Sequence, residues 1–164
     1  MITIEKYAEL CAQMKDTAGD VSKEVAIAAQ HNVSATEWDE SKKGFTAKMS
    51  DPADMGKTAM AFMPLYQAAL DKMRGGGEPC TLELFAKIHA EMGLRKDAAD
   101  PSKKIDYNIV LAEHGVSHPD WLEYNSYWTP RVASETDPKF SMELHKKFAA
   151  LNQVEADRVL GIVR

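Results

Sequence analysis

The chain has 164 residues, of which 45% are hydrophobic and 27% charged, a balance typical of a globular protein large enough to bury a core. The formal net charge is −5, with 9 basic and 11 acidic side chains in residues 1–77 and 11 and 14 in the remainder. Nucleic-acid binding needs a concentrated positive face, so this even acidic excess argues against it. The chain has no apolar run of the roughly 18 residues that a membrane span needs, no signal-peptide pattern, and two cysteines that suit reduced thiols. We therefore expect a cytoplasmic protein without membrane contact.

The first half of the chain predicts four helices in succession. The predicted segments are about 4–14, 21–31, 35–50 and 52–74, with the N-capping residues Thr3, Asp20, Ser34 and Asp51. Ser34 is followed three residues later by Glu37, the pattern of a capping box, and Pro52 stands at a first helical position. No segment shows the strict alternation of a strand between two turns, so every element is expected to be helical.

The second half of the chain repeats the first in order. Residues 3–14 match 81–92, and residues 31–38 match 114–121. Further matches pair Phe45 with Trp128, Asp51-Pro52 with Asp137-Pro138, Phe62 with Phe148, Leu65 with Leu151, and Asp71 with Asp157. Residues 75–79 are the one obvious linker. The sequence therefore predicts an all-α fold of two tandem, pseudo-symmetric four-helix repeats, 1–74 and 80–164, packed into one helical domain.

The sequence contains none of the motifs that commonly mark catalysis, metal binding or cofactor binding. It has no nucleophile elbow, phosphate-binding loop, dinucleotide fingerprint, His-Glu-x-x-His or paired Cys-x-x-Cys pattern. His31 and His114 recur just before a predicted turn, as expected for histidines favoured by the helix dipole and packed on a tryptophan. Glu40 and Glu123 recur as carboxylates of a helix surface. We therefore expect no enzyme, no metal site and no cofactor.

A helix-turn-helix DNA-binding regulator is the alternative interpretation. Residues 28–34, with Asn32 at the turn, have the shape of the turn in DNA-binding helix pairs, and the third helix would read the DNA. However, any tight helix connection uses the same residue types. Lys42 and Lys43 also lie beside two acidic residues, so the acidic balance favours a protein partner over DNA.

Large aromatic residues recur at matching positions of the two repeats. Trp38 and Phe45 are seven residues apart, as are Trp121 and Trp128, so each pair lies on one face of its helix. Because both repeats keep them, these four residues are predicted to form the core.

Three further large residues occur only in the second repeat. Leu122, Tyr124 and Tyr127 stand where the first repeat has Asp39, Ser41 and Gly44, which look like solvent positions. A helix in a small domain cannot bury its whole circumference, so some of the three should be exposed. Since tyrosine is a favoured interface anchor, Leu122, Tyr124 and Tyr127 are candidate partner-binding residues.

The fourth helices differ in the opposite sense. Met55, Met60, Met63 and Tyr66 of the first repeat correspond to Ser141, Lys146, Ala149 and Asn152 of the second. Flexible methionine-rich faces suit adaptable binding surfaces, so Met60, Met63 and Tyr66 are also candidate partner-binding residues. The alternatives are that these residues form the seam between the repeats, or that either surface serves self-association as a homo-oligomer.

The second repeat contains the run Val110-Leu-Ala-Glu-His-Gly-Val-Ser-x3-Trp121-x6-Trp128, followed by Asp137-Pro138 and an Ala-rich helix with Phe148. This pattern resembles a helical repeat of uncharacterised bacterial proteins. Some of those proteins are encoded beside type VI secretion or other toxin-delivery genes. The resemblance covers both repeats, and its motif is structural. It implies a partner-binding role, as an adaptor or an immunity protein whose partner is a secreted toxin or a secretion component. It carries over no functional residue.

Overall fold

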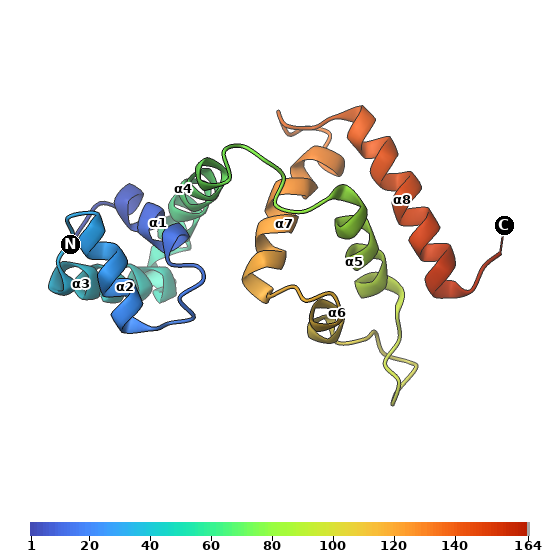
Figure 1. The fold of residues 1–164 in the computed structure, drawn as a ribbon, viewed down its shortest axis with the longest axis horizontal. Coiled ribbons are helices and arrows are strands. Elements are labelled where there is room, and N and C mark those ends of the chain that lie inside the picture. The colour runs from blue at the N-terminus through green and yellow to red at the C-terminus, as the bar shows by residue number, and fades with distance from the viewer. Residues whose placement is uncertain (164) are drawn as a thin grey trace. The chain divides into compact units, whose positions relative to one another are not determined.

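The structure, a computed structural model, describes residues 1–163 and confirms the predicted all-α fold, since eight α-helices and no strand occur among those residues. The chain divides into two compact units, Met1–Gly77 and the residues from Glu78 onward. Figure 1 shows the helices of each unit. The boundary falls within the predicted linker, and each unit contains four α-helices. The pseudo-symmetry of the two repeats stays a prediction.

The first unit contains α1 (Ile4–Gln13), α2 (Val21–Gln30), α3 (Ala35–Ser50), the short 3-10 helix η1 (Pro52–Asp54) and α4 (Lys57–Met73). The second unit contains α5 (Leu82–Leu94), α6 (Tyr107–Glu113), α7 (His118–Val132) and α8 (Met142–Leu160). In each unit the first and fourth helices, α1 with α4 and α5 with α8, make the most extensive helix–helix packing.

The N-capping residues predicted for the first three helices are confirmed. The Ser34 hydroxyl accepts the backbone N–H of Glu37, and the Glu37 carboxylate accepts the backbone N–H of Ser34, which completes the predicted capping box of α3. Asn32 and Gly115, which follow α2 and α6, have φ values of 59° and 66°. The left-handed conformation predicted for both residues is therefore confirmed.

The predicted start of the fourth helix at Pro52 is wrong. Asp51 caps only the 3-10 helix η1, by accepting the Ala53 N–H at 2.8 Å. Met55 and Gly56 then take left-handed backbone conformations, with φ values of 51° and 75°, and α4 begins at Lys57. A proline that follows an aspartate marks the start of a helical turn, but it does not determine how far that turn continues.

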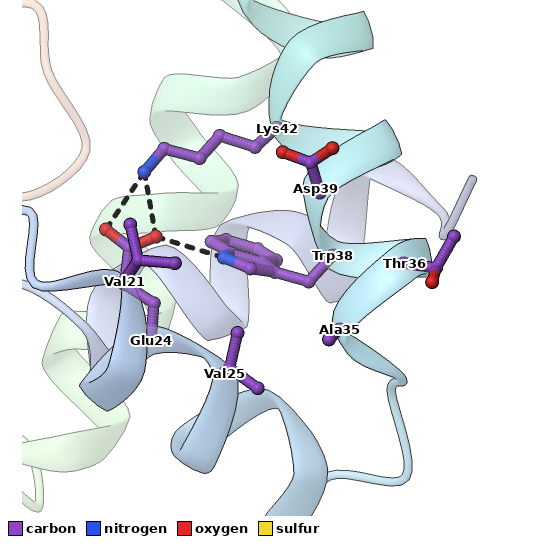
Figure 2. A pocket seen from close by; sticks show the side chains of 8 residues that line it. All are labelled: Val21, Glu24, Val25, Ala35, Thr36, Trp38, Asp39 and Lys42. Carbon is purple, nitrogen blue, oxygen red and sulfur yellow. Dashed lines mark hydrogen bonds and ion pairs between the residues drawn. The ribbon is translucent and has the colours of Figure 1, made fainter.

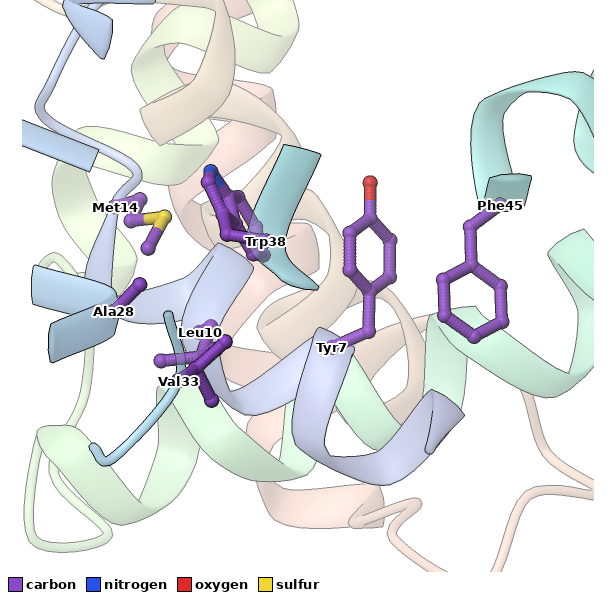
Figure 3. Close-up of a cluster of buried hydrophobic side chains, with 7 residues drawn as sticks. All are labelled: Tyr7, Leu10, Met14, Ala28, Val33, Trp38 and Phe45. Carbon is purple, nitrogen blue, oxygen red and sulfur yellow. The ribbon is translucent and has the colours of Figure 1, made fainter. Parts of the chain in front are cut away.

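The core of the first unit is an aromatic cluster between α1 and α3, shown in Figure 3. Tyr7 of α1 stacks on Phe45 at a ring-centroid distance of 4.6 Å and lies 5.5 Å from Trp38. Phe62 of α4 closes the cluster at 5.7 Å from Tyr7. Leu10 is fully buried beside these rings, so one continuous core holds α1, α3 and α4 together.

Phe85 of α5 is the centre of the corresponding core in the second unit. Its ring lies 5.4 Å from Trp121, 6.4 Å from Trp128 and 5.7 Å from Phe148. Trp128 is fully buried, whereas Trp121 is half-buried. The prediction that the recurring aromatic residues form the core is therefore confirmed, although the two units do not bury their first tryptophan equally.

Candidate functional site

Of the three candidate residues on α7, only Leu122 is largely exposed, at 51% of its full accessible surface. Tyr124 and Tyr127 are half-buried and pack against the core of the second unit. The Tyr127 ring meets Trp128 edge-on at 5.0 Å, and the Arg131 guanidinium lies 3.7 Å from its centre. This packing makes the two tyrosines part of the unit's interior as much as of its surface.

The expectation that Ser41 and Gly44 are solvent positions is wrong. Ser41 is fully buried, and its hydroxyl accepts the N–H of Ile2 at 3.0 Å and donates to the Glu37 carbonyl at 2.6 Å. A side chain at Gly44 would collide with the sulfur of Met1. The first two residues of the chain thus cover this face of α3, where Ser41 is enclosed and a larger residue at Gly44 would require the exposed Met1 side chain to move.

In the second unit, Tyr124 and Tyr127 occupy the places of Ser41 and Gly44. In the repeat alignment, Pro79 and Cys80 take the places of Met1 and Ile2 ahead of α5. The Cys80 carbonyl accepts the indole N–H of Trp128 at 3.3 Å. Because Tyr124 and Tyr127 themselves pack against the core of the second unit, packing explains their presence. Their presence is therefore not by itself a sign of a binding surface.

The exposed face of α4 is apolar along most of its length. Met60 and Met63 are 75% and 47% exposed, and the outer residues between Lys57 and Lys72 also include Ala61, Pro64 and Ala68. Lys57, Ala61, Pro64, Ala68 and Lys72 form a stripe with the spacing i, i+4, i+7, i+11 and i+15 on the helix, and Met60 and Met63 lie along one side of it. Tyr66 lies apart from this stripe, since it is half-buried and stacks on Phe62 at 5.5 Å.

The outer face of α8 differs sharply from that of α4. Lys146 and Ala149 stand where α4 has Met60 and Met63, and Lys147 stands at the place of Ala61. All three are exposed, and Lys147 forms an ion pair of 3.4 Å with Glu83 of α5. At two of these three positions the fourth helix of the second unit therefore presents an ammonium group where α4 presents an apolar side chain.

A cavity of about 380 Å³ opens between α2 and α3, as Figure 2 shows. The side chains that line it are Val21, Glu24, Val25, Ala35, Thr36, Trp38, Asp39 and Lys42. Glu24 is only 6% exposed, and its carboxylate accepts the Trp38 indole N–H at 3.1 Å. It also accepts two hydrogen bonds from Lys42, at 2.7 and 3.0 Å. The cavity therefore combines aliphatic walls with a buried carboxylate.

The pKa of Glu24 is held below its ordinary value by these donors. Burial acts to raise the pKa, but the hydrogen bonds from Lys42 and Trp38 outweigh it, so the carboxylate stays ionised. Sequence analysis missed this residue. The available signal was that Glu24 lies four residues before Ala28, on the face of α2 that points into the core.

A second buried carboxylate, Glu91 of α5, was also missed. It accepts hydrogen bonds from His114 at 2.9 Å and from Arg158 of α8 at 2.6 Å. Burial acts to raise its pKa, but these two donors lower it more. His114 caps the end of α6 as predicted, although its ring contacts the Glu91 carboxylate rather than a tryptophan. Glu91 thus joins the ends of three helices.

Glu123 was predicted as a helix-surface carboxylate, and this prediction is wrong, since Glu123 is 5% exposed. Its counterpart Glu40 is exposed, as expected. Both cysteines are free and half-buried, and burial raises the pKa of the Cys11 and Cys80 thiols to about 11. The thiolate form that reacts or binds metals is therefore scarce at neutral pH.

Two of the three lysines of α3 form ion pairs within the chain. Lys42 is held by Glu24, and Lys43 pairs with Asp39 at 2.7 Å, whereas Lys48 is exposed and lies 6.0 Å from the centre of the Phe45 ring. The ion pairs reduce the positive charge that α3 could offer to a phosphate backbone. Within residues 1–163, no His, Cys, Asp or Glu side chains form a group of three or more that could hold a metal ion. None of the described helices is long and apolar enough to cross a membrane.

Comparison of the chain with protein families, with curated proteins and with solved structures found no match. A function for the chain therefore has to come from its own residues and their geometry.

Proposed function

We propose that the protein is a non-enzymatic protein-binding module whose outer face of α4 is the binding surface. The observation that carries the proposal is the exposure of Met60 and Met63 on a helix whose opposite side is already packed in the core through Phe62. Surface methionines adapt their shape to a partner, because the side chain is unbranched and the sulfur is polarizable.

The repeat alignment strengthens this interpretation. The fourth helix of the second unit packs against α5 much as α4 packs against α1, yet it has Lys146 and Ala149 at the two methionine positions. Packing within a unit therefore does not require methionine there. Apolar side chains that are kept in water without a structural reason commonly mark an interaction site.

The charges at the ends of the stripe indicate the kind of partner. Lys57 and Lys72 are both exposed, and they are 15 residues apart, or about 22 Å along a helix. An amphipathic segment with an apolar centre and an acidic residue near each end would complement this face in both shape and charge. We propose such a segment of another protein as the occupant. The roles of adaptor or immunity protein, with a toxin or secretion component as partner, belong to the same proposal.

The test exchanges the α4 side chains for those of α8. Wild-type protein, the double variant Met60→Lys/Met63→Ala and the control Lys146→Ala are used as baits in the native host, and captured proteins are quantified by mass spectrometry. Each captured partner is then purified and its affinity measured. Loss of two central methionines should weaken binding about tenfold or more, a free-energy change of about 1.4 kcal/mol, while Lys146→Ala should leave binding unchanged.

Thermal melts of the three proteins should differ little, because all of the substituted positions are exposed. Unchanged affinity of every captured partner for the double variant would remove α4 as the binding surface. If a partner binds the double variant but not Lys146→Ala, the binding surface lies on α8 instead. Sedimentation of the wild-type chain alone identifies self-association, which would replace a foreign partner by a second copy of this chain.

A further inference from the structure

The cavity between α2 and α3 contains a buried charge that a repeat of this kind does not need for folding. In the second unit, Tyr107 stands seven residues before the helix-capping histidine, where the first unit has Glu24, and Asn125 stands at the position of Lys42. The second unit therefore closes its core without this ion pair. Burying a charge costs stability even when the charge is paired, so its presence beside a cavity calls for a functional explanation.

The cavity has the chemistry to receive a cation on an apolar stem. Val21 and Val25 of α2 and Ala35 of α3 supply aliphatic walls, and the ionised carboxylate of Glu24 lies among them. Asp39 adds a second carboxylate to the lining. A volume of about 380 Å³ accommodates a side chain of the length of arginine or lysine, whereas the two carboxylates oppose an anion.

The two donors to Glu24 differ in how firmly they are held. The Trp38 ring is buried in the core, so its N–H is fixed in place. Lys42 reaches the carboxylate on a long flexible stem, and its side chain is 45% exposed. Loss of Lys42 alone would leave the buried carboxylate with one donor, which is costly, but a ligand cation that takes its place keeps the charge paired. A guanidinium group could then form two parallel hydrogen bonds with the carboxylate, which an ammonium group cannot do.

We propose that this cavity binds a guanidinium or ammonium group on an apolar stem, and that Lys42 is an internal competitor which the ligand displaces from Glu24. The cation is either the side chain of a peptide segment or a free small molecule. This site is independent of the α4 face, and its occupancy does not depend on the proposed partner of that face.

The indole N–H of Trp38 provides a direct probe, because it donates to Glu24 and Trp38 is the only tryptophan of the first unit. Its NMR signal is followed while N-acetylarginine methylamide, butylguanidinium or the uncharged N-acetylcitrulline methylamide is added. The first two should shift the Trp38 signal and leave those of Trp121 and Trp128 in place. Tighter binding of the arginine amide indicates a peptide side chain, and equal binding indicates a small cation.

Two substitutions locate the site. Lys42→Ala removes the competitor and should tighten binding of the arginine amide about tenfold, whereas Lys48→Ala, the control at an exposed lysine of α3 outside the cavity lining, should not change it. Glu24→Gln should abolish binding. The proposal is overturned if the Trp38 signal of Lys42→Ala does not move at about 50 mM ligand, far above a Kd of about 1 mM. It is also overturned if the citrulline compound binds equally well, a comparison that needs no variant to fold.

Discussion

The two units of this chain share an aromatic cluster at the centre of their cores, and they differ in the residues around it and on their surfaces. In both, a recurring pair of large aromatic residues on the third helix packs against an aromatic residue of the first, Tyr7 in one unit and Phe85 in the other. Their exposed faces differ at matching positions. Met60 of the fourth helix and Asp39 at the cavity between the second and third helices of the first unit correspond to Lys146 and the exposed Leu122 of the second, so the apolar or charged character is reversed at these positions.

The reversal is clearest at the junction of the second and third helices. Asp39 lies at the charged cavity of the first unit, and its counterpart Leu122 is an exposed apolar residue of the second. Tyr107, also exposed, lies 5.8 Å from His118, which is one helical turn before Leu122. The two units keep the aromatic residues of the core but differ at buried positions such as Ser41 and Glu24, so only the changed residues that are exposed are available to a partner.

The largest expected effect is the loss of a core tryptophan. Trp38→Ala should destabilise the first unit by about 3–5 kcal/mol, because it deletes a buried ring and leaves Glu24 with one donor fewer. Trp121→Ala should cost the second unit less, since Trp121 is half-buried. Urea unfolding followed through the remaining indole signals and backbone amides reports on each unit. Equal losses of unfolding free energy would mean that the two tryptophans contribute equally to the stability of their units.

The buried carboxylates should make both units sensitive to acid. The pKa values of Glu24 and Glu91 are lower in the folded chain than their ordinary values, so the unfolded state takes up protons first as the pH falls. Their contribution is fully present above the unfolded pKa, near 4.5, and is lost as the pH drops through the folded values. Stability measured between pH 7 and 3 should fall more steeply for wild type than for Glu24→Gln or Glu91→Gln.

At pH 7, Glu91→Gln should itself destabilise the second unit by about 1–3 kcal/mol, because it weakens hydrogen bonds to His114 and Arg158. The first unit has Gln13 at the matching position. A variant as stable as wild type would show that the second unit, like the first, does not depend on a carboxylate there.

Tyr127→Ser should destabilise the second unit by about 1–2 kcal/mol, because it removes a half-buried ring from the contact with Trp128. Tyr127 is also a candidate partner-binding residue from the sequence, and that its loss weakens association stays a prediction. A melt and a pull-down on the same variant separate the two effects. A stable variant that loses its partner would restore Tyr127 to the binding surface.

The smallest expected effect is that of Leu122→Asp, which gives the second unit the residue of the first. Leu122 is 51% exposed, so the unfolding free energy should change by no more than about 0.5 kcal/mol. A larger loss in a urea titration would show that Leu122 contributes to folding. In that case the difference between Leu122 and Asp39 would affect folding as well as the surface.

Helices, caps and most core residues could be predicted from the sequence because they depend on local chemistry. The Ser34–Glu37 capping box joins residues that are close in the sequence, and the left-handed conformation of Asn32 depends on that residue itself. The coverage of Ser41 by Ile2 could not be predicted, because it joins residues 39 apart. The same holds for the contact between Glu91 and Arg158, which are 67 apart. A buried carboxylate resembles a surface one until its distant partners are known.

Only part of the candidate site could be predicted, because contacts between residues that are distant in the sequence cannot be read from it. The periodicity of α4 and its difference from α8 are visible in the sequence, and both identified Met60 and Met63. Tyr66 was included because it differs between the repeats, but its ring faces Phe62. Which side of a helix a residue occupies follows from periodicity, whereas how far its neighbours cover it depends on the fold.

Binding of a protein partner through the methionines of α4 can be observed at the methyl groups of those residues. The chain has nine methionines, and selective ¹³C labelling of their methyl groups makes each one visible by NMR. When a captured partner is added, the signals of Met60 and Met63 should shift. That of Met142, an exposed methionine of α8, should stay in place. A shift of Met142 with Met60 and Met63 unchanged would contradict the account.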